Sequence, residues 1–151
     1  GRVTLRVNRA NPTVSTASPD FIRAAAGAAG WEGQNWDAAV EVPVTTLDAL
    51  IARHGRPALC KIDVEGFEAE ALAGLSAPLP LVSFEYIPAA IATARACVER
   101  LAALGDYAFN WFPGESHRWA SADWLDTSEL LVHLPALAAG RASGDIFARQ
   151  R

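Results

Sequence analysis

The 151-residue sequence has the composition of a folded protein. Its residues are 51% hydrophobic and 20% charged, without a long polar or repetitive tract, which argues against disorder. The 17 acidic and 13 basic residues give a formal charge of -4 and the arginines are scattered, so no nucleic-acid partner is expected. No apolar run reaches the roughly 20 residues that span a bilayer, and the N-terminus lacks a signal-peptide pattern. We therefore expect one domain over residues 1–151, soluble, cytoplasmic and without a membrane partner.

The N-terminal part combines two strand patterns with a loop-rich stretch. Apolar and polar residues alternate over residues 2–7, which predicts a half-buried strand. Residues 8–39 are rich in Asn, Pro, Ser, Gly and Ala and are predicted to be mainly loop, with a helix that starts after Ser18 and runs to Ala29. A second alternating strand is expected at residues 40–44.

The middle of the sequence predicts an alternation of helices and strands. A helix is expected up to His54, with a threonine of the Thr45-Thr46 pair as its N-cap. Residues 58–64 are apolar on both faces, which is typical of a central strand in a parallel sheet. A short helix at 67–73 and a second apolar strand at 79–86 follow, and this order implies a parallel crossover.

The C-terminal part predicts an amphipathic helix and an antiparallel strand pair. Apolar residues recur at helical spacing between Pro88 and Gly105. An aromatic strand at 107–112 is expected to turn at the following Pro-Gly pair and to return as an antiparallel strand at 117–120. A last helix is predicted through Ala139 with Thr127 or Ser128 as its N-cap, and residues 144–148 are compatible with either a final strand or a tail.

Three acidic residues follow or end the two apolar strands. Asp63 and Glu65 lie at the carboxyl end of the first strand, and Glu85 ends the second. Open α/β sheets bind ligands at this edge, and burying a carboxylate without a partner is costly, so a shared functional site is the favoured interpretation. A structural interpretation stays open, in which Asp63 pairs with Lys61 and Glu65 binds amides at the start of the next helix.

The residues around these acids carry a family resemblance. The run KIDVEGFEAEALAGL begins at Lys61, follows Thr46-Leu47-Asp48 and precedes Phe84-Glu85, and over roughly residues 40–87 it resembles the signature of FkbM-family methyltransferases. The resemblance implies an α/β class I (Rossmann-like) methyltransferase sheet, with parallel strands, crossover helices and a terminal antiparallel pair. It also implies that the chain is the C-terminal part, beginning after the third strand. No GxGxG-like run follows a strand, so the glycine-rich cofactor loop is expected to be missing.

The resemblance further implies a methyltransferase that uses S-adenosylmethionine, with O-methylation of a hydroxyl on a sugar or secondary metabolite. The acceptor would be a small molecule or a glycan. Asp63 is then the first candidate for a catalytic residue, with Glu65 and Glu85 behind it, because a carboxylate can orient the acceptor hydroxyl and take up its proton. No cofactor-binding residue is assigned, and a divalent metal ion held by the same acids stays an open alternative.

Other functions remain compatible with the sequence. Even as part of a methyltransferase, the chain alone is expected to be inactive. The alternative function is that of an inactive fragment or partner domain, which assembles through an exposed sheet edge with a second copy or with another chain. A metal-dependent hydrolase ranks last, because no histidine lies near the acids in the sequence. The loop that contains Trp31 and Trp36 is expected to fold over a site or a partner.

Overall fold

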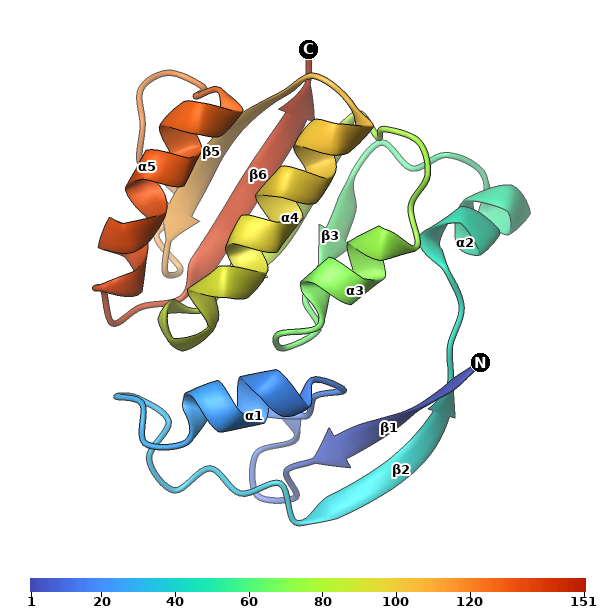
Figure 1. Ribbon diagram of the computed structural model, residues 1–151, viewed down its shortest axis with the longest axis vertical. Helices are drawn as coiled ribbons and strands as arrows, with labels where there is room; N and C mark the ends of the chain where they lie inside the picture. Colours follow the sequence, from blue (N-terminus) through green and yellow to red (C-terminus); the bar gives the residue numbers. More distant parts are fainter.

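The computed structural model describes residues 1–151 and contains two separate sheets (Figure 1). An antiparallel ribbon comprises β1 (Arg2–Val7) and β2 (Ala38–Pro43). The second sheet has four strands in the order β3-β4-β6-β5. Its strands are β3 (Cys60–Ile62), β4 (Leu81–Tyr86), β5 (Tyr107–Pro113) and β6 (Gly144–Gln150).

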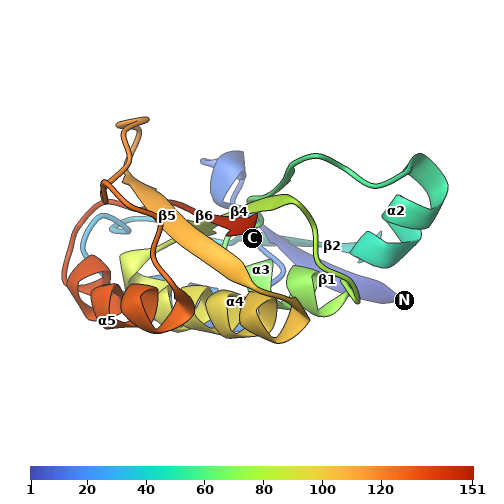
Figure 2. The same cartoon turned by 90° about the horizontal axis from the view of Figure 1, so that it is seen from above.

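Five α-helices and two short 3-10 helices connect the strands. Helices α3, α4 and α5 all lie on one face of the four-stranded sheet (Figures 1 and 2). The helix bounds are α1 (Pro19–Ala25), α2 (Leu47–His54), α3 (Glu68–Ala73), α4 (Ile91–Leu104), α5 (Thr127–Ala138), η1 (Pro12–Val14) and η2 (Pro88–Ala90). None of the helices has both the length and the apolar composition needed to cross a membrane.

The core lies between these three helices and the sheet. Its apolar residues alternate along β4, where Val82, Phe84 and Tyr86 belong to the core on the side of the helices. They pack with residues such as Leu101 of α4 and Leu130 of α5, which are both fully buried. This burial of apolar side chains from several elements is the main stabilising contribution expected for such a fold.

The strand pairing confirms the α/β class and the predicted parallel crossover. β3 and β4 are parallel and are joined through α3. β6 is antiparallel to both β4 and β5, so a terminal antiparallel pair is present. Its partners differ from the prediction, however. Residues 117–120 form no strand, and β5 pairs with β6, because the segment that was undecided between strand and tail lies inside the sheet.

Two other predictions were wrong in extent. The strand expected at 58–64 is only three residues long and lies at the edge of the sheet, where Leu59 is 47% exposed. Helix α1 ends at Ala25 rather than Ala29, because the chain enters a left-handed turn at Gly27. Apolarity on both faces indicated the strand and the Ser18-Pro19-Asp20 start indicated the helix, but neither signal determines where strand pairing or helical hydrogen bonding stops.

The β1-β2 ribbon has one apolar and one polar face. Val3 lies opposite Val42 and Leu5 opposite Val40, and directly opposed residues share a face. The predicted alternation of β1 is therefore confirmed. The apolar face turns toward the carboxyl end of β3, so this ribbon forms one wall of the site that follows.

Candidate functional site

The three acids predicted from the sequence come together at one edge of the four-stranded sheet. Asp63 directly follows β3, Glu65 lies in the turn beyond it, and Glu85 belongs to β4. One carboxylate oxygen from each lies within 4.8 Å of one from each of the others. The parallel register, with Ile62 opposite Phe84, brings the ends of β3 and β4 side by side and so places Asp63 near Glu85.

The turn after β3 has an unusual backbone conformation. Glu65 has a φ of 53° and Gly66 a φ of 85°, so both residues are left-handed. The carboxylate of Glu68 accepts hydrogen bonds from the amides of Val64 and Gly66, each at 3.1 Å. The hydroxyl of Thr16 donates to the carbonyl oxygen of Glu65 at 2.6 Å. The turn is thus held by Glu68 through two backbone amides and by Thr16 through one carbonyl oxygen.

Gly66 is required by packing as well as by φ. A Cβ atom at this position would lie 2.6 Å from the Cβ of Phe21 in α1, closer than real Cβ contacts. Phe21 is itself only 1% exposed and cannot move aside easily. The close approach of α1 therefore explains why glycine follows Glu65.

The structure confirms the ion pair of the structural interpretation but not the role that it gives to Glu65. Asp63 does pair with Lys61, at 3.5 Å between Oδ2 and Nζ, but Lys61 lies nearer to Asp145, at 2.7 Å. Partial burial lowers the pKa of Lys61, yet its contacts with Asp145 and Asp63 raise that pKa overall. The carboxylate of Glu65 accepts no amide of α3, however, and the acid that binds backbone amides is Glu68, which accepts those of Val64 and Gly66 in the turn before the helix.

The carboxyl groups of Glu65 and Glu85 have strongly raised pKa values. Burial first, and then the negative charges of Asp63 and Glu68, raise the pKa of Glu65 to about 7. Burial and the charge of Glu65 raise the pKa of Glu85 to about 8, against a smaller opposing effect of Ser143. Oε2 of Glu85 is buried without a hydrogen-bond partner. Near neutral pH the cluster therefore carries at least one proton that it can exchange.

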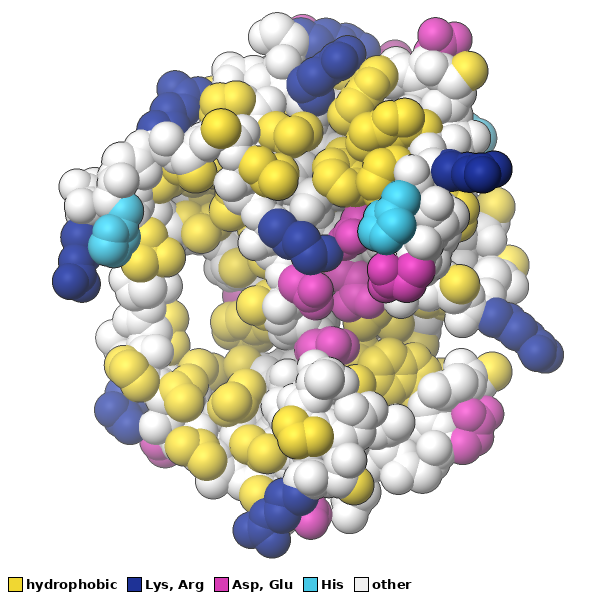
Figure 3. All heavy atoms as spheres, turned by 180° about the vertical axis from the view of Figure 1, so that it is seen from behind, with side chains coloured by type: hydrophobic (Ala, Val, Ile, Leu, Met, Phe, Trp, Pro, Cys, Tyr) yellow, Lys and Arg dark blue, Asp and Glu magenta, His cyan; other side chains and the backbone are white.

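A cavity of about 390 Å³ lies between the acid turn and the ribbon. Asp63 and Glu65 line it together with apolar side chains from both sides, and none of its lining residues is lysine or arginine. Figure 3 shows acidic side chains gathered near the middle of the face opposite the helices, around one basic side chain. The lining comprises Val3, Leu5, Thr13, Ser15, Ala17, Pro43, Val44, Thr45, Asp63, Val64, Glu65 and Phe67.

The family follows from comparison with known proteins. The model of the methyltransferase FkbM domain matches residues 3–96, which is more than half of the chain. The chain belongs to the FkbM methyltransferase family. The match runs from β1 into α4 and contains Asp63, Glu65 and Glu85. No curated protein and no solved structure matched the chain.

In this FkbM domain the acids also form a potential cation site. Divalent cations such as Mg²⁺ and Ca²⁺ prefer oxygen ligands, and Asp63, Glu65 and Glu85 offer three within reach of one another. A cation there would relieve the repulsion that raises the pKa values of Glu65 and Glu85. No histidine belongs to the cluster.

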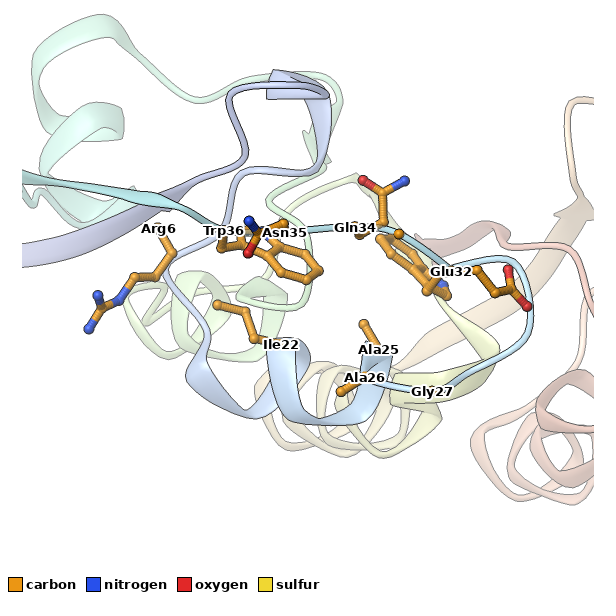
Figure 4. A pocket seen from close by; sticks show the side chains of 11 residues that line it. Arg6, Ile22, Ala25, Ala26, Gly27, Glu32, Gln34, Asn35 and Trp36 are labelled. Atoms are coloured by element: carbon orange, nitrogen blue, oxygen red, sulfur yellow. The ribbon is translucent and has the colours of Figure 1, made fainter.

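The loop that contains Trp31 and Trp36 borders a different and larger cavity. This cavity measures about 630 Å³ and lies between α1 and the loop, with Ile22 and Ala25 facing Trp36 across it (Figure 4). It shares no lining residue with the acid cavity. The indole Nε1 of Trp36 donates to the carbonyl oxygen of Val14 at 2.8 Å, which anchors the ring. The prediction that this loop covers a site stays a prediction.

Sequence reasoning missed two residues of the site, Glu68 and Thr16. Glu68 follows the acids by a few positions and has the sequence position of an ordinary acid in the first turn of a helix. Only its burial, at 2% exposure, distinguishes it from such an acid. Thr16 lies 49 positions before Glu65, so no local pattern connects the two.

Proposed function

We propose that this FkbM domain contributes the acceptor side of a methyl transfer from S-adenosylmethionine to a hydroxyl group. The observation that carries the proposal is the cluster of three carboxylates, of which those of Asp63 and Glu65 line a cavity without a lysine or arginine in its lining. The membership of the chain in the FkbM family supports methyl transfer as the reaction class. The catalytic roles of Asp63, Glu65 and Glu85 are part of the proposal.

The acid cavity suits the charge of this cofactor. S-adenosylmethionine supplies a methyl group activated by a positively charged sulfonium. Carboxylates of Asp63 and Glu65 with apolar walls from Val3 and Leu5 make a cavity that favours a cation over a neutral molecule or an anion. Asp63 and Glu65 are the residues of this chain that would face the positively charged sulfonium of the cofactor.

The acids have the protonation states that the acceptor chemistry needs. A hydroxyl that becomes an ether must lose its proton, and an ionised carboxylate oxygen of Glu65 is suited to accept it, because its pKa of about 7 lies near the operating pH. Asp63, which is more exposed, orients the hydroxyl by accepting its hydrogen bond. Glu85 holds a proton at neutral pH and so limits the negative charge of the cluster.

The acceptor in this proposal is a small molecule or a glycan with a free hydroxyl group, such as a sugar or a secondary metabolite. The apolar side chains that border the acids bind the body of such a molecule, while the carboxylates bind its hydroxyl. A polyanionic acceptor fits poorly, because the cavity already carries negative charge.

Comparing the charged cofactor with its neutral product tests the proposal. Calorimetric titration should give tighter binding of S-adenosylmethionine than of S-adenosylhomocysteine, which lacks the sulfonium charge. Glu65→Gln should reduce this preference severalfold, since it removes one nearby negative charge. Glu70→Gln, at an exposed position on α3, is the matched control and should leave the preference unchanged. Equal affinities in the wild-type protein would contradict the proposal, and binding of neither compound would favour the alternative of an inactive fragment or partner domain.

The same titration with MnCl₂ alone tests the cation alternative. If the acids hold a metal ion, Mn²⁺ binds the wild-type protein, more tightly at alkaline pH because the carboxylates must lose their protons. Asp63→Asn then abolishes binding. Equal Mn²⁺ binding by the wild-type and Asp63→Asn proteins would place the metal elsewhere.

A second candidate function is that of a partner domain that assembles through its sheet edge. The observation that favours it is the position of β3 at the edge, with exposed Leu50, Leu59 and Val64 nearby. A second copy or another chain that adds a strand there would cover these side chains. A strictly monomeric species in light scattering at high concentration would count against self-assembly.

A further inference from the structure

The left-handed conformation of Glu65 needs a structural cause. Besides Glu65, His117 is the single residue other than glycine with a positive φ. Such a conformation costs free energy for a side chain with a Cβ atom and persists only where the surroundings enforce it. Because Glu65 belongs to the acid cluster, the contacts that enforce its conformation also determine where its carboxylate lies.

Glu68 supplies the first of these contacts. A single oxygen, Oε1, accepts both amides of the turn, from Val64 and from Gly66. Amides on either side of Glu65 are thereby drawn toward one point, which fixes the path of the chain between them. The burial of Glu68 shields both hydrogen bonds from competing water.

Thr16 supplies the second contact from a distant part of the chain. Its hydroxyl donates to the carbonyl oxygen of Glu65 and accepts the amide of Ser18 at 2.9 Å. Thr16 is fully buried, and its backbone is paired with Arg6 of β1 in both directions. The hydroxyl is therefore a fixed point, and it binds the carbonyl oxygen of the same Glu65–Gly66 peptide group whose amide donates to Glu68.

We propose that Glu68 and Thr16 are positioning residues that hold Glu65 in its left-handed conformation, so that its carboxylate meets those of Asp63 and Glu85. The inference deepens the proposed function and rests on it for its catalytic meaning. Glu68 itself is no candidate for a catalytic acid, because Oε1 is occupied by two amides and the side chain is absent from the lining of the acid cavity.

Pairs of conservative and disruptive substitutions test this role. Glu68→Gln keeps an oxygen that can accept both amides, whereas Glu68→Ala removes it. Thr16→Ser keeps the hydroxyl, whereas Thr16→Val has nearly the same shape without it. Asp48→Ala is the control, because it removes another carboxylate that accepts a backbone amide, from Ser76 at 2.9 Å, far from the acids in the chain.

The first measurement is independent of catalysis. Backbone ¹³C chemical shifts of Glu65 report its φ, and hydrogen exchange of the Val64 and Gly66 amides reports local opening. We expect Glu68→Ala and Thr16→Val to change the Glu65 shifts, and Glu68→Ala to accelerate exchange of the two amides about tenfold or more. Glu68→Gln, Thr16→Ser and Asp48→Ala should resemble the wild-type protein. Unchanged Glu65 shifts in both disruptive variants would overturn the proposal, and the Thr16 pair decides it if Glu68→Ala fails to fold.

The second measurement asks whether positioning affects the site. The preference for S-adenosylmethionine over S-adenosylhomocysteine should fall in Glu68→Ala and in Thr16→Val as it does in Glu65→Gln, and Thr16→Ser should restore it. A general loss of stability, as in Asp48→Ala, would not produce this pattern. If the wild-type protein shows no preference, the proposed function fails while the shifts of Glu65 still decide the positioning role. A preference that survives in both disruptive variants would overturn the inference.

Discussion

Replacing Glu85 by glutamine is expected to stabilise the protein in alkaline solution and to flatten the pH dependence of its stability. Glu85 lies on β4 with one carboxylate oxygen buried and unpaired. Burial, and then repulsion by Glu65, raise its pKa from an ordinary value of 4.5 to about 8. Between these values the folded protein holds a proton that the unfolded chain has released. Stability therefore falls as the pH rises through this interval and is unaffected by Glu85 below it.

The size of the effect follows from the same interval. One proton of difference changes the free energy of unfolding by about 1.4 kcal/mol per pH unit, so the whole interval corresponds to about 5 kcal/mol. Glu65 titrates together with Glu85, and the two share their repulsion. We therefore expect about 2 kcal/mol from Glu85 alone once the interval is complete. Glutamine has nearly the shape of the protonated acid and cannot ionise.

Urea unfolding followed by tryptophan fluorescence measures this effect. The free energies of the wild-type and Glu85→Gln proteins should agree near about pH 5 and diverge steadily up to about pH 8.5, where the variant is the more stable one. Glu70→Gln removes an exposed acid and serves as the control that should follow the wild-type curve. Parallel curves for the wild-type and Glu85→Gln proteins over this range would refute the electrostatic reasoning.

Three further substitutions test the packing and capping of the fold. Gly66→Ala should lower the free energy of unfolding by about 3 kcal/mol, because the new Cβ meets Phe21 and alanine tolerates the positive φ poorly; thermal unfolding measures this, and an unchanged midpoint would contradict it. Tyr107→Phe should cost about 1–3 kcal/mol in urea unfolding, since the hydroxyl binds both the amide and the carbonyl of Leu79; a cost near zero would mean that water replaces the hydroxyl. Asp126→Ala removes a capping box from α5 and should cost about 1 kcal/mol in the same assay, whereas Asp126→Asn should largely preserve stability.

Local signals were enough to predict most helices. The Thr46 cap is observed, with its hydroxyl accepting the amide of Ala49, because capping depends on neighbours within one turn. The helix after Pro88 is likewise confirmed as η2 followed by α4. Helix periodicity and caps are properties of consecutive residues, so the sequence alone reveals them.

Strand pairing and the buried members of the site were beyond such signals. The aromatic strand, the Pro-Gly turn and Trp119 imitate a hairpin, yet β5 pairs with β6, more than thirty residues later in the chain. The approach of Asp63, Glu65 and Glu85 was predictable, because the ends of parallel neighbours meet at one edge. The contact of Thr16 with Glu65 was not, since it depends on how a separate ribbon packs against the sheet.

The position of β6 has a consequence for how the chain folds. β6 lies between β4 and β5, although it follows both in the sequence. When β5 has emerged from the ribosome during synthesis, α3 and α4 can already form beside β4. β5, however, still lacks its hydrogen-bonding partner β6. Until β6 is in place, the hydrogen-bonding edges of β4 and β5 are unpaired, and unpaired strand edges can associate with other chains. We therefore expect the yield of folded protein to depend strongly on residues 144–150, and deletions there to cause aggregation rather than a local loss of structure.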